Sequence, residues 1–292
     1  MSPYLNPLHK VLILTPDSVA STFCQRLITY YLNHHKHTTV NWHELINHFS
    51  ENYVFLLSSL AASQNSIVAR LSQYRLNDIN LPHNNFLKGC DIFFKKKIVP
   101  RRCSFETALS LSMRVYFNHP LNVYSEEAFK EVFYTTKPSD IPIEIFDSQL
   151  RHLERHYVWV DSKFTDLIYV SHENLVFDTD STLNNIFGYV SNDLNLTDLN
   201  KNMFLYYRGL ADKSEDFKKY EEYSESLKNK FPQFPFSLSA KKFTLSEKLS
   251  KVKNFNELYD YYSSETSNQF EAVSKSDLNN RIIQEDKFFG LS

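Results

Sequence analysis

Short, continuous apolar runs that alternate with helix-period segments constrain the fold of this chain more than any other feature. Residues 10–14 form such a run, and apolar residues at helical spacing follow over 21–33. A second run, over 166–170, precedes a helical pattern over 182–190. Apolar runs of this length are typical of strands buried on both faces, and strands that alternate with helices form parallel sheets. The sequence therefore predicts an α/β fold, a three-layer parallel sheet with helices on both faces.

Further elements are expected between these segments. The interval 138–142 contains two prolines and predicts a break in the chain. The other expected elements are strands over 38–42 and 91–99, helices over 105–117 and 144–156, and partly helical structure over 53–73.

The C-terminal part differs in composition from the rest of the chain. From about residue 200 the apolar periodicity weakens and charged residues become more frequent. Beyond about residue 240 an apolar stripe recurs at Leu245, Leu249, Phe255 and Leu258. We therefore expect two parts. Residues 1–212 form an α/β domain, and residues 213–292 form a charged, mainly helical C-terminal extension that packs on the domain or projects from it.

Bulk composition bears on partners and location. The formal net charge of −2 supplies no excess of cations, so we expect neither nucleic acid nor a membrane as partner. No apolar run approaches the roughly 18–20 residues that cross a bilayer, and the N-terminus has no signal-peptide pattern. The three cysteines stand far apart in apolar settings, as reduced thiols do in intracellular proteins.

The location and origin that we expect follow from the same composition. We expect a cytoplasmic protein from the reduced thiols and the absence of a signal-peptide pattern. The scarcity of glycine (four residues) and the abundance of Asn and Lys are typical of an AT-rich genome such as that of a phage or a marine or parasitic microbe, and a phage-encoded protein would lie in the host cytoplasm. The cluster His34-His35-Lys36-His37 lacks the spacing of a metal site, and we expect no metal.

A candidate phosphate-binding segment follows the apolar pair Ile98-Val99. Glu106 and Ser110 stand four and eight positions after Arg102. An arginine and a hydroxyl that meet where a strand passes into a helix N-terminus bind phosphate through the guanidinium fork, the hydroxyl and the unpaired backbone N–H groups. The alternative is an exposed basic strand end before a helix that Ser104 caps.

This segment resembles the 3′-phosphate-binding element of sulfotransferases that use 3′-phosphoadenosine 5′-phosphosulfate (PAPS). In that family an arginine, an aspartate and a serine follow the same spacing, and Arg102, Glu106 and Ser110 match them. Arg101 is an alternative occupant of the arginine position. The resemblance implies the P-loop NTPase-like sulfotransferase fold, with PAPS as cosubstrate and its 3′-phosphate at Arg102 and Ser110.

The segment after the first expected strand resembles the 5′-phosphosulfate loop of the same family. Ser21 and Thr22 match its hydroxyl pair, but the segment has no Lys or Arg, and Ala20 stands where the family has glycine. The alternative is a plain helix cap by Asp17 or Ser18. The residues that the resemblance places around the 5′-phosphate are Asp17, Ser18, Val19, Ala20, Ser21 and Thr22.

A third segment resembles the Tyr-Glu-Asp-Leu region of the family, whose role is mostly architectural. Glu173, Leu175, Asp178 and Leu183 match it in type and order. A helix that ends in Tyr157-Val158-Trp159 precedes it, as in many sulfotransferases. The alternative is an unrelated strand, turn and helix. The family's C-terminal Arg-Lys-Gly loop has no convincing counterpart here.

Sulfuryl transfer requires a base for the acceptor hydroxyl and a cation for the transferred group. In the family the base is a Glu or a His, and the resemblance points first to Glu44 and second to His43 as catalytic residues. The alternative for Glu44 is a first-turn acid that complements the helix dipole. Arg70 is a candidate for the missing cation, and a solvated surface arginine is the alternative.

The resemblance as a whole implies a protein that transfers a sulfuryl group from PAPS to a hydroxyl of a small molecule or glycan. The alternative is a sulfotransferase fold that has lost catalysis and serves as a binding or structural, virion-associated protein. Another kind of P-loop kinase is disfavoured because no Gly-x-x-x-x-Gly-Lys-Ser/Thr motif occurs.

Overall fold

A computed structural model describes residues 8–16, 21–34, 39–42, 65–73, 83–116, 133–191, 244–265 and 273–288, with the single positions 58 and 62. The chain divides into two compact units. The first unit comprises Met1–Arg101 and His156–Phe204, and the second comprises Arg102–Arg155 and Leu205–Ser292. This division differs from the expected boundary after residue 212, because it groups the C-terminal segment with residues 102–155.

The first unit contains one five-stranded sheet in the order β2-β3-β1-β4-β5. All four neighbouring pairs are parallel. This arrangement confirms the predicted parallel α/β class. The strands are β1 (Lys10–Leu14), β2 (Thr39–Trp42), β3 (Ser66–Leu71), β4 (Lys96–Arg101) and β5 (Leu167–Ser171).

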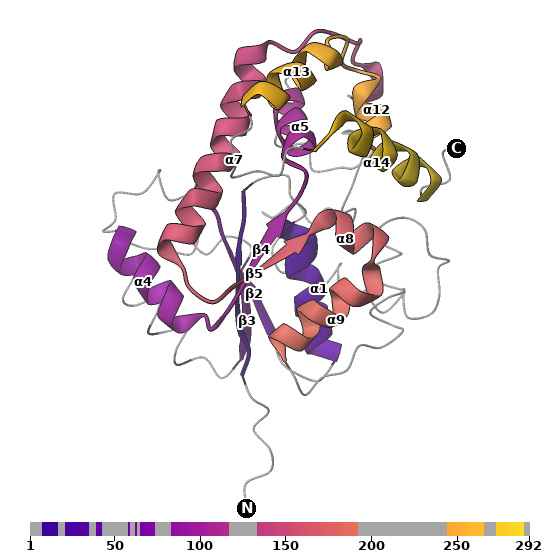
Figure 1. The fold of residues 1–292 in the computed structure, drawn as a ribbon. Coiled ribbons are helices and arrows are strands. Elements are labelled where there is room, and N and C mark those ends of the chain that lie inside the picture. Colours follow the sequence, from indigo (N-terminus) through magenta and orange to yellow (C-terminus); the bar gives the residue numbers. More distant parts are fainter. Residues whose placement is uncertain are drawn as a thin grey trace, which may run out of the picture. The chain divides into compact units, whose positions relative to one another are not determined.

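Helices lie on both sides of this sheet (Figure 1). On one side are α1 (Ser21–His34), α8 (His172–Phe177) and α9 (Thr179–Val190). The rings of Tyr31 on α1 and Phe187 on α9 stack there with centroids 3.8 Å apart. On the other side are α4 (His83–Phe93) and the C-terminal part of α7 (Ile143–Lys163).

The sheet is the core of the first unit because its central strands are apolar on both faces. Residues 11–14 of β1 and Ile98 and Val99 of β4 have no exposed surface. Pro100 fits within β4 because the pairing of β4 with β1 ends at Ile98, so its missing N–H is not needed on that side.

The second unit is helical among its described residues. It contains α5 (Ser104–Tyr116), the first part of α7, α12 (Leu245–Leu249), α13 (Phe255–Glu265) and α14 (Lys275–Phe288). The ring of Phe105 lies at its centre. The ring centroids of Phe146, Phe255, Tyr259 and Tyr262 lie 5.4 to 5.9 Å from that of Phe105.

Two of the expected elements are wrong in part. Residues 66–71, expected within a partly helical segment, form strand β3, because Ile67, Val68 and Ala69 are buried as in a sheet interior. The strand expected over 91–99 begins only at Lys96, since residues 91–93 end helix α4. The other expected strands and helices on described residues agree with the structure to within a few residues, except that α7 continues to Lys163. The helices within the described ranges include none with the length and apolar character of a membrane span.

Candidate functional site

The strand order identifies one edge of the sheet as the candidate site. In the sheet order β2-β3-β1-β4-β5, the strands that follow β1 in the chain, β2 and β3, lie on one side of β1. The strand that follows β4, which is β5, lies on the other side of the sheet. β1 and β4 are neighbours, so the direction of winding reverses between them. In open α/β sheets, ligands bind outside the carboxyl ends of the strands at such a switch point.

At this edge, β1 is followed by a buried threonine. The backbone N–H of Thr15 donates to Leu71 O at 3.1 Å, and the Thr15 hydroxyl donates to Pro16 O at 2.5 Å. Thr15 is 1% exposed and Ser72, just beyond β3, is 4% exposed. These bonds fix the start of the segment that leads to helix α1.

Arg101 ends β4 at the same edge. Its guanidinium carbon lies 3.7 Å from the ring centroid of Tyr169 and 5.0 Å from that of Tyr157, which places the cation against two aromatic rings. Tyr169 donates its hydroxyl to Asp161. Burial raises the pKa of Tyr169 to about 12, with a further contribution from Asp161. The phenol therefore stays protonated at neutral pH.

Arg102 begins the second unit and pairs with Glu106. Its Nη2 atom donates to Glu106 Oε1, and the two side chains are 8% and 9% exposed. Ser110 donates its hydroxyl to the backbone oxygen of Glu106 at 2.8 Å, one turn earlier on α5. The structure thus brings together the three residues that match the sulfotransferase pattern.

Lys248 on α12 joins this group, 138 positions away from Ser110 in the chain. Its Nζ atom lies 2.9 Å from Ser110 Oγ and 3.4 Å from Glu106 Oε1. Sequence reasoning missed Lys248, and no local pattern signals it, because only the fold brings α12 to α5. We call Arg102, Glu106, Ser110 and Lys248 the basic cluster.

Most of the other predicted site residues are not described with their side chains. Asp17, Ser18, Val19 and Ala20 lie outside the described residues, as do the predicted catalytic residues Glu44 and His43. Ser21 and Thr22 begin α1, as their predicted place at a helix start requires. Arg70 lies within β3, opposite Ile13 of β1, and is partly buried.

The third matched segment has a structural role in the first unit. Ser171 ends β5 and caps α8, accepting from Asn174 N at 3.2 Å. Its hydroxyl donates to Glu173 Oε2 at 2.9 Å. Glu173 therefore supports the turn from strand to helix, as expected for an architectural position.

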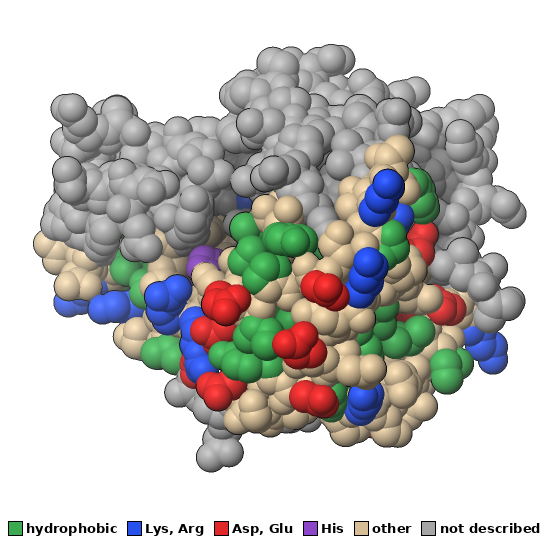
Figure 2. Space-filling model, turned by 90° about the horizontal axis from the view of Figure 1, so that it is seen from above, with side chains coloured by type: hydrophobic (Ala, Val, Ile, Leu, Met, Phe, Trp, Pro, Cys, Tyr) green, Lys and Arg blue, Asp and Glu red, His purple; other side chains and the backbone are tan. Residues whose placement is uncertain are grey.

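The described surface shows no single dominant charge in the view of Figure 2. Acidic side chains there lie among hydrophobic ones, with lysines and arginines between and beside them. Within the described residues, no group of three or more His, Cys, Asp or Glu side chains is arranged to hold a metal ion. Comparison with known proteins gives no match, since no family model, curated protein or solved structure is significantly similar to this chain.

Proposed function

We propose that this protein binds PAPS and transfers its sulfuryl group to a hydroxyl of a small molecule or glycan. The observation that carries the proposal is the strand order. The two segments that resemble phosphate-binding elements of sulfotransferases follow β1 and β4, and these strands are neighbours at the switch point of the sheet.

Each segment has a chemical role in this proposal. Ser21 and Thr22, at the N-terminus of α1, bind the 5′-phosphate with hydroxyl and backbone N–H donors. Arg102 and Ser110 bind the 3′-phosphate through a guanidinium and a hydroxyl. Their donor types fit a phosphate monoester.

In the transfer step, the acceptor oxygen attacks sulfur and the bond between sulfur and the 5′-phosphate oxygen breaks. Glu44 takes the proton of the acceptor hydroxyl, with His43 as the alternative base. Adenosine 3′,5′-bisphosphate leaves with the bonding electrons. The reaction therefore requires no redox partner.

A second candidate function is a nucleotide-binding or structural protein without catalysis. Two observations favour it. Residues 15–22 contain no lysine or arginine to stabilise the transferred group. Arg102 and Ser110 already contact Glu106 and Lys248.

Calorimetric titration with adenosine 3′,5′-bisphosphate tests the proposal. We expect micromolar binding by the natural chain and a loss of at least about tenfold in Arg102→Ala, because a charge-assisted contact to phosphate is removed. Arg155→Ala is the matched control, since Arg155 is exposed on α7 and its Nε atom donates to the backbone oxygen of Arg151, one turn earlier. That variant keeps the natural affinity.

Two results would decide against parts of the proposal. No binding at millimolar nucleotide would overturn it, although the parallel α/β fold would remain. Binding with no sulfuryl transfer from PAPS to any of a panel of sugar, phenol and alcohol acceptors would favour the second candidate function.

A further inference from the structure

The basic cluster contains more cationic groups than the resemblance to sulfotransferases assigns to it. We infer that Lys248 is a third binding residue for the 3′-phosphate, and that the Glu106 carboxylate holds the place of a phosphate oxygen until the nucleotide binds. This inference rests on the proposed nucleotide binding. It makes α12, near the C-terminus, part of the binding site.

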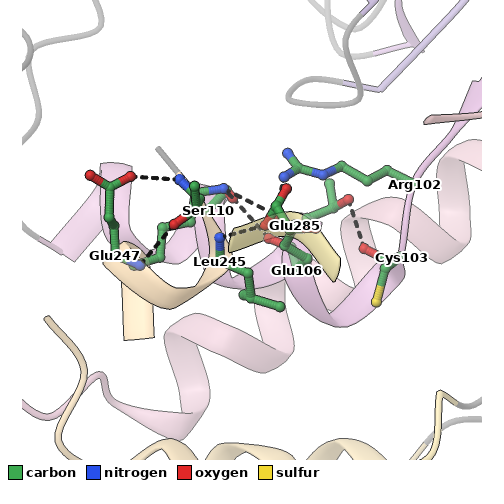
Figure 3. Close-up of polar contacts among 10 residues, drawn as sticks. Arg102, Cys103, Glu106, Ser110, Leu245, Glu247 and Glu285 are labelled. Atoms are coloured by element: carbon green, nitrogen blue, oxygen red, sulfur yellow. Dashed lines mark hydrogen bonds and ion pairs between the residues drawn. The ribbon is translucent and has the colours of Figure 1, made fainter. Parts of the chain in front are cut away.

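The position of Lys248 is fixed by the start of its helix. Thr244 and Glu247 form a capping box, in which Thr244 accepts from Glu247 N at 3.1 Å and Glu247 accepts from Thr244 N at 2.8 Å. In addition, Leu245 N donates to Glu285 Oε2 of α14 at 2.8 Å (Figure 3). Glu247 and Glu285 thus hold the helix start, while Lys248 reaches α5.

Two cationic donors converge on one anionic oxygen in the cluster. Arg102 Nη2 and Lys248 Nζ both contact Glu106 Oε1, and Lys248 Nζ also contacts Ser110 Oγ. The side chains of Arg102, Glu106 and Lys248 are 8%, 9% and 10% exposed. Charge-assisted hydrogen bonds are stronger where water is excluded, and a phosphate oxygen accepts the same donors as a carboxylate oxygen.

The charge of the cluster favours a ligand that is more anionic than Glu106. One carboxylate carries a single negative charge, whereas a phosphate monoester carries nearly two at neutral pH and offers three acceptor oxygens. An ammonium, a guanidinium and a hydroxyl together match such a group. A phosphate that displaces Glu106 therefore gains contacts to donors already held in place by α5 and α12.

A purely structural role for Lys248, as a tie between α12 and α5, predicts different behaviour. Loss of that tie would reduce stability and would weaken every nucleotide equally. Loss of a phosphate contact weakens only ligands that carry the 3′-phosphate. Adenosine 3′,5′-bisphosphate and adenosine 5′-monophosphate differ in that group alone, so their affinity ratio separates the two roles.

The test is calorimetric titration of the full chain with both nucleotides. We expect Lys248→Gln to weaken the bisphosphate about tenfold and to leave the monophosphate unchanged, and Lys248→Arg to restore most of the loss. Lys253→Gln, at an exposed position on the same segment, is the matched control. Thermal unfolding of each variant shows whether it is folded.

A second variant keeps the inference testable if Lys248→Gln does not fold. Glu106→Gln removes the competing charge, and we expect it to bind the bisphosphate about tenfold more tightly. Three results would each overturn this inference without affecting the proposed function. Lys248→Gln could bind the bisphosphate with natural affinity, or it could bind both nucleotides equally more weakly. Glu106→Gln could bind the bisphosphate more weakly than the natural chain does. If the natural chain binds neither nucleotide, both the proposed function and this inference fail.

Discussion

Lys97 shows how a single buried charge is accommodated within the first unit. The residue is 1% exposed, and its ammonium group lies 3.0 Å from Asp91 Oδ1 and 3.1 Å from the backbone oxygens of Asp91 and Phe94. Asp91 also accepts from Thr165 N at 3.0 Å. One carboxylate therefore neutralises a buried cation and joins α4 to the chain just before β5.

The environment of Asp91 determines its ionisation. Burial alone raises the pKa of Asp91, but the hydrogen bond from Thr165 N and the contact with Lys97 outweigh it and hold that pKa below the ordinary value. An acid with a lowered folded-state pKa stabilises the fold fully above its unfolded pKa, about 3.9. The stabilisation is lost as pH falls through the lower folded-state value.

We predict that Asp91→Asn lowers the free energy of unfolding by about 2 kcal/mol at pH 7, because Lys97 stays buried without its counter-charge. The difference between the natural chain and the variant shrinks below about pH 4, because Asp91 is protonated there first in the unfolded chain and then, at its lower pKa, in the folded protein. Urea unfolding at several pH values measures both effects. Asp166→Asn is the control, since Asp166 is exposed and its φ of 52° is a conformation that Asn also tolerates. A difference that does not depend on pH would contradict the prediction.

At the scale of elements, Asn254 joins two segments of the second unit. Its Oδ1 accepts from Ile141 N and its Nδ2 donates to Ile141 O, both at 2.9 Å. Beside this pair, Ser139 and Val252 form an isolated parallel bridge. Asn254 thus ties the turn between α12 and α13 to the chain just before α7.

We predict that Asn254→Ala lowers the free energy of unfolding by about 2 kcal/mol, because it leaves the backbone groups of Ile141 without their partners next to a fully buried side chain. Asn256→Ala is the matched control. Asn256 is exposed, and its bond from Lys275 Nζ at 2.7 Å is a surface contact worth at most about 1 kcal/mol. Denaturant unfolding compares the two, and equal effects would contradict the prediction.

Local sequence patterns predict some of the strands and helices of this fold, and they fail for others for physical reasons. The strand at 10–14 and the helix at 21–34 are local signals, since four apolar residues in a row and a helical period are both visible in the sequence. Strand β3 was missed because an apolar run of this length does not distinguish a strand from a buried helix. The Arg102–Glu106–Ser110 group is predictable because its members stand four positions apart across the start of one helix, whereas Lys248 requires knowledge of the tertiary fold.

At the scale of the whole molecule, the cysteines report on each unit. Cys24 on α1 and Cys90 on α4 lie on opposite sides of the sheet in the first unit, and Cys103 lies in the second unit. They are 2%, 0% and 7% exposed, and none forms a disulfide. Burial raises the pKa of Cys24 to about 12 and also raises that of Cys90, to which the charge of Asp91 adds. Native thiols of this kind react very slowly, since the thiolate is the nucleophile.

We predict that Cys24 and Cys90 become reactive at the same urea concentration, because each packs against a different face of one sheet and both are exposed when that sheet is lost. Mass spectrometry after a brief pulse of a thiol reagent gives a midpoint for each cysteine. Cys103 gives the midpoint of the second unit in the same experiment, and fully denatured protein, in which all three thiols react, is the control. Reaction of Cys24 well before Cys90 would show that α1 leaves the sheet while α4 remains, and would contradict a single cooperative core in the first unit.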